Sequence, residues 1–201
     1  MAASQVAIVN CGGANIASLT NALERLNANY SVTMDASRIR NSSHVIIPGV
    51  GHAADAMQKL QAQQLNGTIA NLEQPVLGIC LGLQLLAQSS AEENVQCLGV
   101  IDAQVSKLTS DREFPIPNIG WCKVSALREH RLLAGIDDGS YFYFVHSYVI
   151  PCGPYTLATA NHALKFTAIL EQDNFFATQF HPERSAEVGA KLLSNFLGAN
   201  Q

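Results

Sequence analysis

Charged residues are scarce in this chain, and no segment concentrates charge of one sign. Asp, Glu, Lys and Arg make up 14% of the 201 residues, and the formal net charge is −4. A nucleic-acid-binding surface needs clustered Lys and Arg, so we expect no nucleic-acid partner. Hydrophobic residues account for 48% of the chain. This share argues against a disordered chain and favours a largely buried α/β sheet.

Long apolar runs and paired cysteines are missing as well. The longest apolar runs have the length of strands, far short of a membrane span, and the first residues lack the pattern of a signal peptide. No C-x-x-C pair or H-x-x-x-H pair is present, which argues against a disulfide framework or a zinc site. The five cysteines are scattered as Cys11, Cys80, Cys97, Cys122 and Cys152. We therefore expect a cytoplasmic protein with no membrane contact, no metal and no cofactor.

Apolar strands alternate with helical patterns over the first ninety residues. The sequence predicts strands at residues 6–9, 30–34, 45–47 and 76–79, and helices at 16–26, 53–63 and 82–88. This alternation indicates βαβ units and a parallel sheet. Closely spaced β-like runs follow at 103–107, 122–124, 141–150, 155–160, 166–170 and 175–180, before a helix at 186–197. We predict one α/β domain, residues 1–201, with a central, mostly parallel sheet flanked by helices and additional antiparallel strands in the second half.

The segment GICLG, residues 78–82, places a cysteine between two glycines where a predicted strand meets a predicted helix. This is the G-x-S-x-G nucleophile elbow with cysteine in place of serine. The glycines suit a turn too tight for a Cβ atom, and a helix N-terminus stabilises a thiolate and a developing oxyanion. Cys80 is therefore the candidate nucleophile. We expect the other four cysteines to be ordinary small apolar residues.

A histidine and a glutamate stand two residues apart after the strand predicted at 175–180. Pro182 favours an extended conformation at His181. If that geometry continues, His181 and Glu183 project to the same side, because side chains in a strand alternate with a period of two. A carboxylate placed in this way holds the imidazole ring and stabilises its charged form. We predict a catalytic triad of Cys80, His181 and Glu183.

Five segments, in this order, carry a resemblance to a known family. They are ANI at 14–16, IPGVG at 47–51, GICLGLQ at 78–84, YFVHSY at 143–148 and QFHPERS at 179–185. Together they resemble the class I (triad) glutamine amidotransferases, and within them the histidine-biosynthesis branch, the glutaminase subunits of imidazole glycerol phosphate synthase. One motif differs from the family pattern P-H-[MI]-G-W-N, since Asn118 and Cys122 replace its His and Asn.

The resemblance implies that the chain hydrolyses L-glutamine to L-glutamate and ammonia. It also implies a heterodimer with a (β/α)₈-barrel cyclase, which uses the ammonia to make imidazole glycerol phosphate and aminoimidazole carboxamide ribotide.

The resemblance also assigns further site residues. The oxyanion hole would comprise Val50, Gly51 and the Leu81 amide. The substrate contacts would be Gln84, Glu92 or Glu93, His146, Ser147 and Tyr148. The partner interface and a gate would comprise Asn15, Trp121, Tyr143 and Arg184.

Three alternatives remain open from the sequence. The acceptor synthase could belong to anthranilate, purine or pyridoxal phosphate synthesis. A DJ-1-like cysteine hydrolase shares the elbow in outline but lacks the late His-Pro-Glu. A catalytically silent binding subunit is the third alternative, and the intact triad argues against it.

Overall fold

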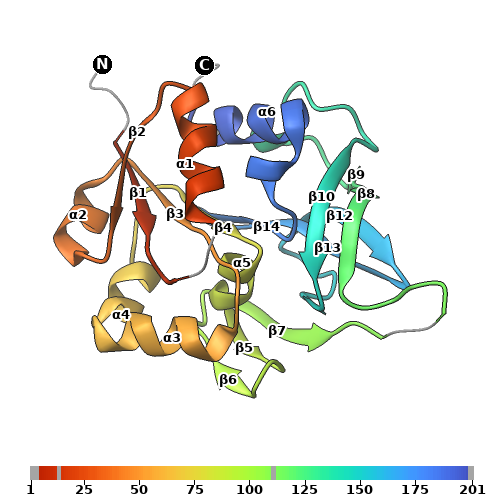
Figure 1. Ribbon diagram of the computed structural model, residues 1–201, viewed down its shortest axis with the longest axis horizontal. Helices are drawn as coiled ribbons and strands as arrows, with labels where there is room; N and C mark the ends of the chain where they lie inside the picture. Colours follow the sequence, from red (N-terminus) through yellow and green to blue (C-terminus); the bar gives the residue numbers. More distant parts are fainter. Residues whose placement is uncertain (1–4, 13–14, 110–111, 199–201) are drawn as a thin grey trace.

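A computed structural model describes residues 5–12, 15–109 and 112–198, and its centre is an eight-stranded mixed sheet (Figure 1). Ala14, the first residue of the ANI segment, lies outside the described residues. In spatial order the strands are β2 (Asn29–Thr33), β1 (Gln5–Val9), β3 (His44–Ile47), β4 (Val76–Ile79), β14 (Phe175–Thr178), β13 (Leu164–Gln172), β12 (Thr156–His162) and β9 (Ser125–Ala126). Pairing is parallel from β2 to β14 and antiparallel from β14 to β9. The predicted fold class is confirmed.

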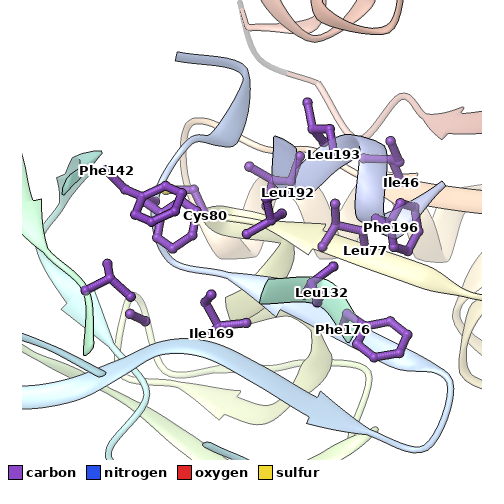
Figure 2. Packing of buried hydrophobic residues seen from close by; sticks show 14 of the residues in the cluster. Ile46, Leu77, Cys80, Leu132, Phe142, Ile169, Phe176, Leu192, Leu193 and Phe196 are labelled. Carbon is purple, nitrogen blue, oxygen red and sulfur yellow. The ribbon is translucent and has the colours of Figure 1, made fainter. Parts of the chain in front are cut away.

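The parallel strands are buried on both faces, which explains their continuous apolar sequences. In β1, Val6 and Ile8 belong to one core cluster, whereas Ala7 and Val9 belong to another. The first cluster includes α1 (Ile16–Arg25) and α6 (Ala186–Phe196), and Figure 2 shows Leu192 and Phe196 packing above the sheet. The second includes α3 (Ala53–Ala62), α4 (Leu65–Ala70) and α5 (Leu81–Leu86). These helices lie on the opposite side of the sheet (Figure 1).

Two smaller sheets lie beside the central sheet (Figure 1). One pairs β8 (Asn118–Lys123) with β10 (Tyr141–His146) in antiparallel fashion. The other has the order β11 (Tyr148–Val149), β7 (Ile101–Lys107), β5 (Ala87–Ser90) and β6 (Val95–Gln96). The β8–β10 and β7–β11 pairs are antiparallel, as the sequence predicted for the second half, whereas β5 pairs with β7 in parallel.

Two local predictions were wrong, and two short helices were missed. The helix predicted at 82–88 ends at Leu86, because Ala87 already belongs to β5, which pairs with β7. The single strand predicted at 141–150 is two strands, interrupted at Ser147. The helices α2 (Ala36–Asn41) and α4 were not predicted. Each has six residues, too few to show a clear helical period. Within the described part of the chain, no helix is long and apolar enough to cross a membrane.

Candidate active site

Cys80 occupies a strained elbow between β4 and α5. Its backbone has φ 53° and ψ −100°, a conformation that residues with a Cβ rarely adopt and that is often found at functional sites. A Cβ on Gly78 would lie 2.7 Å from the Gly82 carbonyl oxygen, and a Cβ on Gly82 would lie 1.9 Å from that of Ile47. Both glycines are therefore required by close backbone approach, as the sequence predicted.

The His181 imidazole is held by Glu183 in a nearly sealed position. The distance from Nδ1 to Glu183 Oε1 is 2.8 Å, and the two side chains are 3% and 1% exposed. The His181 backbone is extended, as predicted, but Glu183 lies in the 3₁₀ turn η2 (Pro182–Arg184) rather than in a continuing strand. The pair forms because this turn brings the carboxylate back onto the ring. The predicted proximity is confirmed, and the predicted local geometry is wrong.

His181 also interacts with the sulfur of Cys80. Burial alone would lower the pKa of His181, but the charge and hydrogen bond of Cys80, together with Glu183, outweigh burial and raise that pKa from 6.5 to about 10. The backbone of His181 is fixed as well, since its N–H donates to the Tyr143 carbonyl over 2.9 Å. The three residues of the predicted triad are thus brought together from two segments about 100 residues apart in the sequence.

A cavity of about 270 Å³ opens beside the sulfur. Cys80 is only 6% exposed and belongs to the core cluster, yet it lines this cavity together with His181. The cavity wall contains every residue of the predicted oxyanion hole and, of the two alternative glutamates, Glu92. Its lining comprises Val50, Gly51, Cys80, Leu81, Gln84, Glu92, Pro117, Val145, His146, Ser147, Tyr148, His181 and Arg184.

The predicted oxyanion segment already contacts the amide that follows Cys80. The Leu81 N–H donates to the Gly49 carbonyl oxygen over 3.4 Å. Gly51 has φ +111°, a value that favours glycine. In this conformation the Leu81 amide is occupied by the protein's own backbone.

Glu92, rather than Glu93, faces the cavity. Glu92 Oε2 accepts a hydrogen bond from the Ala53 N–H over 2.9 Å at the start of α3, and Oε1 lies 3.5 Å from His52 Nδ1. The Glu93 side chain is 55% exposed and lies 4.0 Å from the same nitrogen. Of the two predicted alternatives, Glu92 is therefore the one that lines the cavity.

Asn118, the departure from the family motif, contacts His146. His146 Nδ1 lies 3.1 Å from the Tyr148 carbonyl oxygen, and Nε2 lies 3.1 Å from Asn118 Nδ2. The carbonyl can only accept and the amide nitrogen can only donate, so the ring is neutral with its proton on Nδ1. Burial lowers the pKa of His146 to about 4, in agreement with this assignment. Asn118 also lies 3.6 Å from Cys122 Sγ.

Of the four residues predicted at the partner interface, three lie together and Asn15 lies elsewhere. The Trp121 side chain, 50% exposed, packs edge-on against Tyr143 at 5.9 Å, and the Arg184 guanidinium lies 5.7 Å from the centroid of the same Tyr143 ring. Asn15 instead donates its amide to Glu183 Oε1 and lies 3.3 Å from His181 Nδ1. No sequence signal revealed this contact.

A larger hollow of about 720 Å³ lies over residues 126–138, away from the elbow. Its lining includes His130 and Arg131 and contains no cysteine. Among the residues with described positions, no group of three or more His, Cys, Asp or Glu side chains is arranged to hold a metal ion.

The fold and the site together define a class: α/β proteins that place a cysteine on a strand-to-helix elbow against a carboxylate-held histidine. A family model described as glutamine amidotransferase class-I matches residues 7–199. The chain belongs to the class-I glutamine amidotransferase family.

Relatives within the family carry a more specific name. The chain is 43% identical over 192 residues to imidazole glycerol phosphate synthase subunit HisH 2 of Legionella pneumophila, covering 96% of both chains. It is 46% identical over 193 residues to subunit HisH of Yersinia pseudotuberculosis, covering 96% of this chain and 98% of that one. The crystal structure of a glutamine amidotransferase from Thermotoga maritima shares the fold, with a TM-score of 0.67 at 19% identity over 99% of this chain and 83% of that one.

Proposed function

We propose that this chain is the glutaminase subunit of an imidazole glycerol phosphate synthase. It hydrolyses L-glutamine and passes ammonia to a cyclase subunit in histidine biosynthesis. The observation that carries the proposal is the pair Cys80 and His181 at the wall of a 270 Å³ cavity, with Glu183 behind them holding the imidazole ring. The relatives named HisH support the choice of synthase, because they match this chain over nearly their full length.

The proposed reaction is acyl transfer through a thioester. The Cys80 thiolate attacks the side-chain carbonyl carbon of glutamine, an S–C bond forms, and the carbonyl oxygen becomes an oxyanion. As the intermediate collapses, the C–N bond breaks and His181 gives its proton to the departing nitrogen, which leaves as ammonia. His181 then takes a proton from water, whose oxygen attacks the thioester. The C–S bond breaks, glutamate leaves and Cys80 is restored, while Glu183 holds the ring throughout.

The oxyanion hole of this mechanism requires a change in the backbone. The Leu81 N–H is engaged by the Gly49 carbonyl, so this is the resting form of the site. A rotation of the peptide between Gly49 and Val50 removes that carbonyl and turns the Val50 N–H towards the cavity. Two donors then face the oxyanion, and each such donor is typically worth about 10²–10³ in rate.

Charged and polar groups around the cavity suit a free amino acid. The carboxylate of Glu92 offers a partner for the substrate ammonium, with Gln84 beside it on α5. Ser147 and Tyr148 also line the cavity and are the proposed contacts of the α-carboxylate. Neutral His146 fixes this wall through its bond to the Tyr148 carbonyl.

The exposed face of the β8–β10 sheet is the proposed docking surface for the cyclase, a (β/α)₈ barrel. Ile119, Trp121 and Tyr141 are 62%, 50% and 57% exposed on this face. Exposed aromatic residues grouped in this way are typical of interfaces. Arg184 and Tyr143 lie between this face and the cavity and form the proposed gate for ammonia.

The nucleophile is tested by replacing Cys80→Ala and measuring ammonia release from glutamine in the presence of the cyclase. We expect no detectable release, because no thioester can form, together with an unchanged far-UV circular dichroism spectrum. The matched control is Cys152→Ala, which removes an exposed cysteine outside the cavity and should retain the wild-type rate. Ammonia release by the Cys80→Ala protein would refute the proposal.

The gate is tested by Arg184→Ala. We expect the variant to lose most of the stimulation of glutaminase by the cyclase, because the guanidinium no longer covers Tyr143 at the mouth of the cavity. Stimulation is measured as the ratio of glutamine turnover with and without the cyclase. An unchanged ratio would rule out the gate while leaving the triad untouched.

A further inference from the structure

Gln179 is a polar side chain in the core beside the nucleophile. It is fully buried and directly follows β14, which pairs in parallel with β4 so that Thr178 lies opposite Ile79. Continuing this register places Gln179 next to Cys80. The distance from Gln179 Nε2 to Cys80 Sγ is 3.9 Å, within the range of a hydrogen bond to sulfur.

The amide oxygen of Gln179, Oε1, lacks a hydrogen-bond partner among the described residues. A buried amide oxygen without a partner costs stability, and an apolar side chain of the same length would avoid that cost. Core packing alone therefore does not explain a glutamine at this position.

Two neutral groups near the sulfur distinguish its protonation states. The Val145 carbonyl oxygen lies 3.6 Å from Sγ and accepts a hydrogen bond only from the thiol. The Gln179 amide donates, and a donor is stabilised most by a charged acceptor. Besides Cys80 itself, the charged or titratable groups that line the same cavity are Glu92, His146, Tyr148, His181 and Arg184, and of these His181 interacts with the sulfur.

We propose that Gln179 is a positioning residue that donates its amide N–H to the Cys80 thiolate, holding the sulfur in its reactive form. The proposal rests on Cys80 as the nucleophile of the proposed function. Gln179 does not line the substrate cavity, so it acts on the sulfur and not on glutamine.

The test is the rate at which iodoacetamide alkylates Cys80 in Gln179→Met, followed by mass spectrometry of the Cys80 peptide. Methionine keeps the length of the side chain and removes the donor. We expect alkylation at pH 7 to slow about tenfold, the change that follows from losing one hydrogen bond to a charged group. The pH profile of the rate should move to higher pH. With glutamine as substrate, kcat should fall and KM should stay unchanged.

Stability separates this role from a structural one. Gln179→Met removes the unpartnered oxygen, so its thermal unfolding midpoint should not fall below that of the wild type. Gln179→Ala leaves a cavity and should unfold at a lower temperature, yet it should slow alkylation as much as Gln179→Met. The matched control is Asn66→Leu, which removes another buried, unpartnered amide oxygen away from the sulfur and should leave alkylation unchanged.

The proposal is overturned if Gln179→Met reacts at the wild-type rate, or if alkylation rates across the variants follow their unfolding temperatures. Alkylation needs only the sulfur and the probe. A chain that reacts as expected but releases no ammonia from glutamine would therefore disprove the proposed function and leave the role of Gln179 standing. Mapping the modified peptide excludes a signal from Cys152, which is exposed.

Discussion

At the scale of single residues, buried polar side chains in the site are held by very specific partners. His146 is the clearest case, because one ring nitrogen faces a carbonyl and the other faces an amide. Glu183 is another, since Asn15 and His181 both contact its Oε1. For His146, these two partners fit one protonation state of the ring, so its contribution to folding depends on pH.

His146 should make the protein less stable in mild acid. Its pKa in the folded state, about 4, lies below the unfolded value of 6.5. Between these two pH values, the unfolded chain binds a proton at His146 and the folded chain does not. Stability therefore rises with pH between these two values and is lost as pH falls through that window. Between pH 7 and pH 5 the wild type should lose about 2 kcal/mol more than His146→Gln.

Urea unfolding of both proteins at the two pH values measures this difference. His44, whose pKa is also lowered by burial, is present in both proteins, so its contribution cancels. Equal losses in the wild type and His146→Gln would show that His146 is not held neutral in the folded state.

At the scale of elements, the strand-to-helix elbow depends on close backbone contact between β4, α5 and β3. The Cβ position of Gly82 overlaps the Ile47 carbonyl oxygen at 1.9 Å, and backbone atoms cannot move aside as a flexible side chain can. Gly67 in α4 is the opposite case, because a Cβ added there has no atom within 4 Å. The two glycines therefore respond differently to the same substitution.

Gly82→Ala should destabilise the fold by about 3 kcal/mol or more, as overpacking against a rigid neighbour does. Gly67→Ala should stabilise it by about 0.5–1 kcal/mol, because alanine loses less backbone entropy in a helix. Chemical denaturation of both variants measures the change in the free energy of unfolding. Similar values for the two would mean that the elbow tolerates a side chain at position 82.

The sequence predicts some of these elements and contacts and not others. Strands such as β1 and β4, and helices such as α1 and α6, were predicted because their apolar residues follow a regular period. The strand β5 has the sequence AQSS, with no such period, and exists because it pairs with β6 and β7. The elbow and the His181–Glu183 pair can be predicted from short sequence motifs, because their residues are close together in the chain. The contacts of Asn15 and Gln179 with the site do not, because they join residues about 100 or more positions apart.

At the scale of the whole molecule, the site lies between the central sheet and the β8–β10 sheet. Tyr143 belongs to β10 and accepts the His181 N–H at its carbonyl, while its ring contacts both Trp121 and Arg184. The proposed docking face is therefore directly connected to the backbone of the proposed base. If the cyclase binds at this face as proposed, its effect can reach the triad through the contacts of one residue, Tyr143.

Trp121→Ala should weaken binding of the cyclase subunit by at least about 2 kcal/mol, or roughly thirtyfold in Kd, as expected for an aromatic residue at the centre of an interface. Isothermal titration calorimetry measures the affinity. Leu127→Ala is the control, because Leu127 is similarly exposed, at 53% against 50%, but lies outside the β8–β10 sheet. Equal effects of the two substitutions would place the cyclase on another face.

The hydrogen bond between the Leu81 amide and the Gly49 carbonyl bears on when glutamine can be hydrolysed. While it persists, the chain's own oxygen takes the position that a reacting amide oxygen needs, so the free subunit resembles an enzyme inhibited by its own main chain. Under the proposed function, glutamine that enters the cavity in this state would leave intact. Deamidation would then begin only when the cyclase is bound, and little ammonia would escape into bulk water.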